Sequence, residues 1–169
     1  MTSDTTLDRE RTDVIQTLDK HRGFLRQTIE GMSEDQARTT STVSALTLAA
    51  ILQHVTAVER QWRTFILEGT GGFANMTPED YAREWAVPDD VTLAELVAAY
   101  DAGAAETDAV VASIASLDTD HALPEAPWFE PGARWSARRT LLHIIAETSQ
   151  HAGHADIIRE AIDGAKTMG

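Results

Sequence analysis

Hydrophobic residues recur at spacings of three, four and seven along most of the chain, which is the pattern of amphipathic helices. The first such segment runs from about Thr6 to Glu30, and Gly31 suits its end because glycine reaches the left-handed conformation cheaply. A second segment runs from about Leu46 to Glu68, before the glycine-rich break at Gly69–Gly72.

Two further long helices are predicted in the second half of the chain. One begins at Thr92, which forms a capping box with Glu95, and continues to about Leu117. The other begins at Ser136, a good N-cap residue, and ends at Asp163, where a glycine follows.

Short helices are predicted in two of the connections. Ser33 caps a helical turn over Met32–Arg38. Thr77 caps another, with Pro78 at the first helical position and Asp80 three residues after the cap.

Together these elements predict an all-α protein, a four-helix bundle with additional short helices in the connections. The stretch Asp118–Trp135 contains three prolines and is predicted to be a linker without helix, and no segment shows the alternation of a strand. A length of 169 residues fits a single domain over residues 1–169.

The charge and the missing cysteines narrow the function classes. The chain has 27 acidic and 14 basic side chains and a formal charge of −13, which argues against nucleic-acid binding because phosphate contacts need a basic face. It has no cysteine, which excludes disulfides, a cysteine zinc site and a cysteine nucleophile.

The first residues, Met1–Asp4, lack the basic and apolar regions of a signal peptide. No apolar run approaches the roughly 20 residues of a membrane span. We therefore expect a cytoplasmic protein that does not enter a membrane.

The last predicted helix carries an unusual set of histidines and a carboxylate. At 100° per residue, His143, Glu147, His151 and His154 share one stripe of that helix. Glu147 and His151 are four residues apart and are therefore neighbours on the helix surface, so together they can hold one metal ion. His143 and His154 compete with them as ligands.

A third ligand has to come from another helix. His54 lies in the middle of the second long helix, where a lone histidine is usually a hydrogen-bonded core residue. With Glu147 and His151 on a partner helix, the ligand interpretation becomes the better one, since bundles build metal sites from facing helices. Such a donor set suits zinc, with nickel, iron or manganese as alternatives, and it leaves a coordination position open.

Other polar residues have weaker claims to a role. Asp156 and Arg159 either support a ligand or form a surface ion pair with each other. His21 and His121 have no supporting neighbours in the sequence, and we interpret both as structural or surface residues.

Two segments resemble the DinB-like superfamily, which includes thiol-dependent S-transferases and the mycothiol-dependent maleylpyruvate isomerases of actinobacteria. Trp135–Glu160 resembles the last bundle helix of that superfamily, and Leu52–Glu59 matches its second-helix pattern. The resemblance in layout covers essentially the whole chain, whereas the specific motifs occupy only these two helices.

The resemblance implies that His54, Glu147 and His151 hold the metal. Many DinB-like proteins have a histidine where this chain has Glu147, and the glutamate matches the mycothiol-dependent branch. His154 stands where other members often have glutamine, so His143 and His154 are left as alternative ligands or as supports for the ligands.

The same resemblance implies a metal-dependent thiol S-transferase. The metal would activate a small thiol such as mycothiol for attack on an electrophile, with no catalytic side chain assigned. Candidates for substrate binding are Arg134, Trp135, Arg138 and Arg139, although exposed solubilising charges and an anchor for the proline-rich loop explain them equally well.

Two other functions remain open. One is a non-catalytic metal-binding stress-response protein of the same fold, and the other is a metal-free bundle with its histidines hydrogen-bonded in the core. A homodimer is common in the superfamily, but the sequence shows no apolar helix face that demands one.

Overall fold

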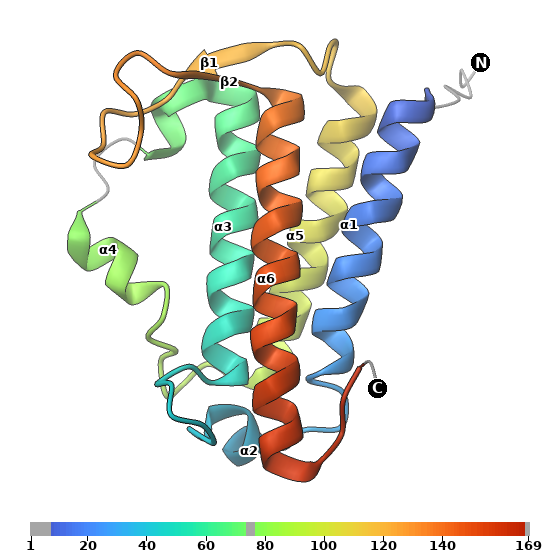
Figure 1. Ribbon diagram of the computed structural model, residues 1–169, viewed down its shortest axis with the longest axis vertical. Helices are drawn as coiled ribbons and strands as arrows, with labels where there is room; N and C mark the ends of the chain where they lie inside the picture. The colour runs from blue at the N-terminus through green and yellow to red at the C-terminus, as the bar shows by residue number, and fades with distance from the viewer. Residues whose placement is uncertain (1–7, 74–76, 168–169) are drawn as a thin grey trace.

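In the computed structural model, which describes residues 8–73 and 77–167, four long helices lie side by side along the longest axis (Figure 1). They are α1 (Arg9–Gln27), α3 (Leu48–Glu68), α5 (Leu93–Ser113) and α6 (Ala137–Asp163). The shorter elements are α2 (Glu34–Arg38), the 3-10 helix η1 (Gly69–Phe73), α4 (Pro78–Arg83), β1 (Asp120–Ala122) and β2 (Arg134–Ser136). The predicted all-α bundle with short additional helices is confirmed.

The connection between α3 and α5 is the long one. These two helices run in the same direction, so the chain returns along the length of the bundle, and α4 lies on that return path beside α3 (Figure 1). Bundles with such a crossover need a long connecting segment. The crossover brings the residues after α4 against the middle of α3.

Side chains cap the start of every α-helix in the described part of the chain. The residue before each helix accepts a hydrogen bond from a backbone N–H of its first turn. These caps are Asp8, Ser33, Thr47, Thr77, Thr92 and Ser136. Capping boxes are complete at Ser33–Gln36, Thr77–Asp80 and Thr92–Glu95. The starts predicted at Thr77, Thr92 and Ser136 are confirmed.

Two predicted helix ends are too late. The first helix stops at Gln27 rather than Glu30, and the chain then turns through Gly31 at φ 74°. The third long helix stops at Ser113 rather than Leu117, because the guanidinium of Arg11 donates to the carbonyls of Val111 and Ile114 at 2.7 and 2.9 Å. The start predicted at Thr6 lies outside the described residues.

The expectation of no strand is wrong within the stretch predicted as a linker. β1 pairs with β2 in antiparallel register, with His121 opposite Trp135. Each strand has three residues, which is too short for an alternation pattern to be visible in the sequence. An ion pair of 2.5 Å between Arg134 and Asp120 joins the two strands.

The hydrophobic core has two parts with a polar layer between them. One part is built from α3 residues between Leu48 and Val55, and the other from α3 residues between Val58 and Ile66. Buried polar residues lie at the level between the two parts on all four long helices. They are Arg22, Glu59, Thr107, Thr148 and His151.

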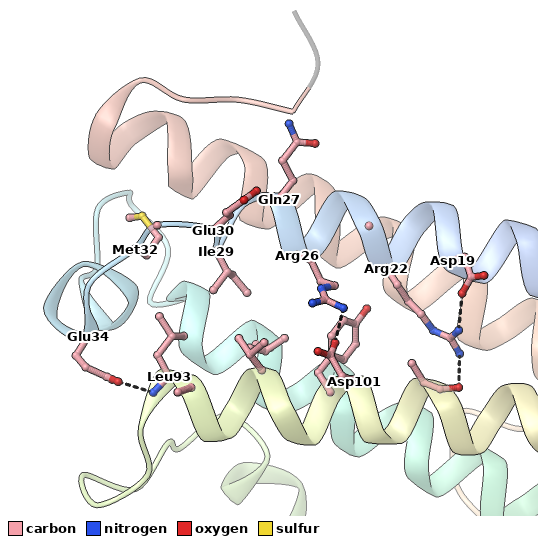
Figure 2. A pocket seen from close by; sticks show the side chains of 17 residues that line it. Asp19, Arg22, Arg26, Gln27, Ile29, Glu30, Met32, Glu34, Leu93 and Asp101 are labelled. Atoms are coloured by element: carbon pink, nitrogen blue, oxygen red, sulfur yellow. Dashed lines mark hydrogen bonds and ion pairs between the residues drawn. The ribbon is translucent and has the colours of Figure 1, made fainter.

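A cavity of about 1110 Å³ opens between α1 and α5 (Figure 2). Arg22 extends from α1 at its edge and forms a buried ion pair with Glu59, a second with Asp108 at 2.9 Å and a third with Asp19 at 3.2 Å. The hydroxyl of Tyr100, which also lines the cavity, is buried without a hydrogen-bond partner. Within the residues described, no helix is long and apolar enough to cross a bilayer.

The outward side of α6 carries two exposed large apolar side chains. Leu142 and Ile157 are 52% and 62% exposed.

Candidate metal centre

His54, Glu147 and His151 lie together where α3 packs against α6. Each offers one ligand atom, and these atoms lie within 4.8 Å of one another. Nε2 of His151 is 3.6 Å from Oε2 of Glu147. Tetrahedral zinc with ligands at roughly 2.1 Å separates its donors by about 3.4 Å. The three side chains therefore suit a small divalent cation in donor type, and a shift of about 1 Å or less brings donors that are up to 4.8 Å apart to this spacing.

The charge on Glu147 favours a cation. The side-chain hydrogen bond from His151 lowers the pKa of Glu147, partial burial opposes that shift, and the neighbouring His143, His151 and His54 lower it further. The carboxylate is therefore ionised at neutral pH, as a metal ligand must be.

His54 is held from two sides by residues after α4. The ring of Trp85 stacks on its imidazole with centroids 3.8 Å apart and planes at 16°. Oε2 of Glu84 is 3.3 Å from Nδ1 of His54, which is buried and makes no hydrogen bond. Glu84 thus contributes its charge beside Nδ1, which leaves Nε2 for a metal.

The segment that carries Glu84 is fixed to α3. Nε2 of Gln53 donates to the carbonyls of Arg83, Glu84 and Ala86 at 3.0, 3.1 and 3.1 Å. Gln61 donates to the carboxylate of Glu84. Sequence reasoning missed Glu84 and Trp85, and the glutamine at 61 on the same helix face as His54 was the available signal.

His143 and His154 lie beside the three-residue cluster and are not part of it. Nδ1 of His154 is 3.4 Å from Nδ1 of His151, on the far side of that ring from Glu147. Nε2 of His143 is 3.7 Å from Oε1 of Glu147. Burial lowers the pKa of His143 despite the nearby charge of Glu147, so this imidazole is neutral at pH 7. Both histidines are placed to orient a ligand.

The three arginines near the start of α6 have different partners. Arg134 pairs with Asp120, and Arg138 pairs with two carboxylates, those of Glu10 and Asp118. Arg139 is exposed, with its guanidinium 4.1 Å above the ring of Trp135. Arg139 is therefore the arginine of the three without an ion pair in the described chain.

Aromatic rings join the 123–133 loop to α3. Trp62 stacks on Trp135 with centroids 4.9 Å apart. Phe73 and Phe129 meet the ring of Trp62 in edge-to-face contacts. The ring of His143 also meets Trp62, at 4.8 Å. This aromatic cluster both anchors the loop and borders the candidate metal centre.

The remaining candidates have structural contacts. Nε2 of His121 is 3.2 Å from the carbonyl of Ile66, and His21 contacts Phe24, as expected for structural residues. The suggested ion pair between Asp156 and Arg159 is wrong. Arg159 pairs with Asp163 at 2.9 Å, and Asp156 accepts from the backbone of Thr167.

Two cavities lie away from the three candidate ligands. The larger is the one between α1 and α5. The smaller, of about 470 Å³, is lined by residues of α3, α4 and α5 and by Glu84. Neither is lined by His54, Glu147 or His151.

Comparison with known proteins gives one family match and one similar solved structure. The family model described as mycothiol-S-transferase matches residues 13–164. Among solved structures, the chain is similar to a conserved protein from Enterococcus faecalis, with a TM-score of 0.66 and 17% identity over 94% of this chain and 100% of that one. At this identity the likeness shows the fold alone. No match was found among curated proteins.

Proposed function

We propose that this chain, which belongs to the mycothiol-S-transferase family within the DinB-like superfamily, joins a small thiol such as mycothiol to an electrophilic substrate with the help of a bound divalent metal. The observation that carries the proposal is the cluster of His54, Glu147 and His151. Zinc is the preferred metal for two imidazoles and one carboxylate, with nickel, iron and manganese as alternatives.

A metal with three protein ligands keeps a place for a thiol and favours its deprotonated, nucleophilic form. The protein residues hold and shape that place. Glu147 supplies the negative charge, Glu84 and Trp85 fix the ring of His54, and His154 fixes the ring of His151. The chain has no cysteine, so the nucleophilic sulfur has to come from a second molecule.

The electrophile would lie on the aromatic side of the centre. Trp135 on β2 contacts the ring of His143 with centroids 5.2 Å apart, and the exposed Arg139 above the Trp135 ring offers a positive charge to an acidic substrate. Arg134 and Arg138 are less suited to that task, because acidic side chains already neutralise them.

Metal content and turnover, measured on the same variants, test the proposal. The zinc-loaded chain, incubated with mycothiol and a chlorinated aromatic acceptor, is expected to release chloride and form the thioether. Glu147→Ala and His151→Ala should lose both zinc and turnover, whereas Glu79→Ala, on the exposed side of α4, should keep both. Full turnover in Glu147→Ala with full zinc content would refute the assignment.

The position of the cavities favours a second candidate, a non-catalytic metal-binding stress-response protein. Neither of the two cavities described above is lined by His54, Glu147 or His151, so these two open spaces lie away from the proposed metal. If this candidate is right, zinc binds stoichiometrically, but calorimetry with mycothiol, glutathione and cysteine shows no heat of binding to the zinc-loaded chain.

A further inference from the structure

The cavity of about 1110 Å³ between α1 and α5 has no part in the proposed thiol transfer. Residues of α1, α5 and the connection between α1 and α2 line it, together with Leu52 of α3 and Glu34 of α2. At one end, the carboxylate of Glu34 accepts a hydrogen bond of 2.6 Å from the backbone N–H of Leu93 (Figure 2). Pockets for small molecules commonly have volumes of about 300–1,000 Å³, so this cavity is large enough to hold one.

A glycine in the middle of α1 leaves this space free of a side chain. Gly23 lines the cavity together with Asp19 and Gln27, which lie four residues before and after it and therefore on the same side of the helix. A Cβ placed on Gly23 would meet no neighbouring atom within 4 Å. Glycine inside a helix is destabilising relative to alanine, so helix stability does not explain this residue. An open cavity beside it does.

The inner lining of the cavity combines apolar side chains with one neutral hydroxyl. Ile29, Leu52 and Leu93 are buried and supply the apolar surface. The hydroxyl of Tyr100 is buried and has no hydrogen-bond partner in the described chain. Burial and the nearby charge of Glu59 raise the pKa of Tyr100, so its hydroxyl keeps the proton and is available as a donor. Buried polar groups are normally hydrogen-bonded, which indicates that the partner of this hydroxyl is another molecule.

The charges around the cavity disfavour an ionic ligand. Arg26 pairs across it with Asp101 at 2.7 Å (Figure 2), and Arg22 pairs with Glu59 and two further carboxylates. The lining contains two arginines and four carboxylates, a net charge of −2. A carboxylate ligand would therefore be repelled. An ammonium group offers only donors, whereas the Tyr100 hydroxyl needs an acceptor for its proton.

We propose that this cavity binds a neutral, largely apolar small molecule whose carbonyl oxygen accepts the hydrogen bond of Tyr100. The apolar body of the ligand contacts Ile29, Leu52 and Leu93, and the hydroxyl fixes its orientation. Such a division between an apolar wall and a few placed polar groups is typical of small-molecule sites. Ketones, esters and amides belong to this class. None of the three candidate metal ligands lines the cavity, so binding does not require the metal.

Calorimetric titration of the full chain with three probes tests the class of ligand. The probes share a heptyl chain and differ in the group at its end: methyl heptyl ketone, octanoate and octylamine. The ketone is expected to bind at one site per chain, at least tenfold more tightly than either ion, and equally well with and without zinc. Absence of ketone binding, or an ion that binds as tightly as the ketone, would overturn the proposal.

Two glycine variants test whether the probe occupies this cavity. Gly23→Leu fills the free space beside α1 and should abolish binding of the ketone. Gly153→Leu is the matched control, because Gly153 is an exposed glycine of α6 outside the cavity and its Cβ would also meet no neighbouring atom within 4 Å. It should bind the ketone like the wild-type chain. Far-ultraviolet circular dichroism checks that both variants are folded, and ketone binding that survives in folded Gly23→Leu places the probe elsewhere and refutes the proposal.

Tyr100→Phe tests the hydrogen bond, since it keeps the ring and removes the hydroxyl. The variant should bind the ketone about three- to tenfold more weakly, the usual effect of losing one hydrogen bond. Its Tm should not fall, because the hydroxyl has no partner within the described chain. A lower Tm with unchanged ketone affinity would show that the hydroxyl serves the folded core and not a ligand, which would also overturn the proposal.

Discussion

The imidazole of His54 lies beside the indole of Trp85 and near two carboxylates. One is that of Glu84, which follows α4, and the other is that of Glu147 on α6. Trp85 stacks on the imidazole, and Glu84 lies beside Nδ1. A carboxylate in this position fixes the orientation of a ligating histidine and raises its basicity. Glu84→Gln should therefore weaken zinc binding by about 10- to 100-fold, the usual effect of losing such a partner.

Competition with a zinc chelator measures this effect. Glu79→Gln is the matched control, since Glu79 is an exposed glutamate on α4, just before the segment that carries Glu84. It should bind zinc like the wild-type chain. Equal zinc affinity for Glu84→Gln and Glu79→Gln would show that Glu84 has no part in the metal centre.

At the residue scale, the sequence predicted the cluster but not its support. Glu147 and His151 follow from spacing within one helix, and family resemblance selected His54. Glu84 could not be found in this way, because it lies 30 residues after His54 and reaches it only through the crossover. Local periodicity says nothing about where such a return path meets the bundle.

At the scale of the elements, the polar layer decides how α1 attaches to α3. Arg22 and Glu59 are 3% and 1% exposed and form a buried ion pair. Glu59→Gln removes the charge that balances the guanidinium and should lower the free energy of unfolding by about 3–5 kcal/mol. Asp19→Asn, which removes an exposed partner of the same arginine, should cost less than about 1 kcal/mol.

Urea unfolding of the two single variants and of Arg22→Met/Glu59→Leu measures these costs. The double variant should regain most of the lost stability, because it removes the two fully buried charges together. Asp108 also loses its partner, but its side chain is 30% exposed and so stays in contact with water. A Glu59→Gln cost as small as that of Asp19→Asn would contradict the role given to the buried pair.

The capping box at the start of α5 makes the stability of the folded chain depend on pH. Hydrogen bonds from the backbone N–H and then the hydroxyl of Thr92 lower the pKa of Glu95 below its usual 4.5. A carboxyl whose pKa falls on folding stabilises the folded state above its unfolded pKa, and the contribution disappears as the pH falls through the folded pKa. Glu95→Ala should therefore destabilise the chain at pH 7 and much less at about pH 3.5.

Urea midpoints of the wild type and of Glu95→Ala at the two pH values provide the measurement. Glu125→Ala is the control, since Glu125 is exposed in the loop between the strands, and its effect should be small at both. If the urea midpoints of the wild type and of Glu95→Ala differ by the same amount at both pH values, the charge of Glu95 is irrelevant to the cap.

Element boundaries were predictable where the chain itself supplies the signal. Thr77, Thr92 and Ser136 begin helices because their own side chains satisfy the first turn. The end of α5 was not predictable, since a guanidinium from α1 takes up its last carbonyls. The strands were not predictable either, because tertiary pairing rather than local pattern creates three-residue strands.

At the scale of the whole molecule, hydrophobic patterning was enough to predict the bundle but not which faces of its helices meet. The exposed side of α6 and the cavity between α1 and α5 depend on how four helices pack together. Hydrophobic patterning identifies the apolar face of a helix but not the helix that packs against it. The geometry of the candidate metal centre was not predictable for the same reason, because its ligands come from two helices that only packing brings together.

A metal in this centre would therefore also stabilise the fold. It would join His54 on α3 to Glu147 and His151 on α6, about 90 residues later in the chain. Zinc at one hundred times its dissociation constant should add about 2.7 kcal/mol to the free energy of unfolding, because it binds the folded state alone. For a chain of this size, that gain raises Tm by about 5–10 °C. Differential scanning calorimetry with and without zinc measures the shift. Glu147→Ala should melt at one temperature in both conditions, whereas a zinc-dependent shift that survives this substitution would place the ion elsewhere.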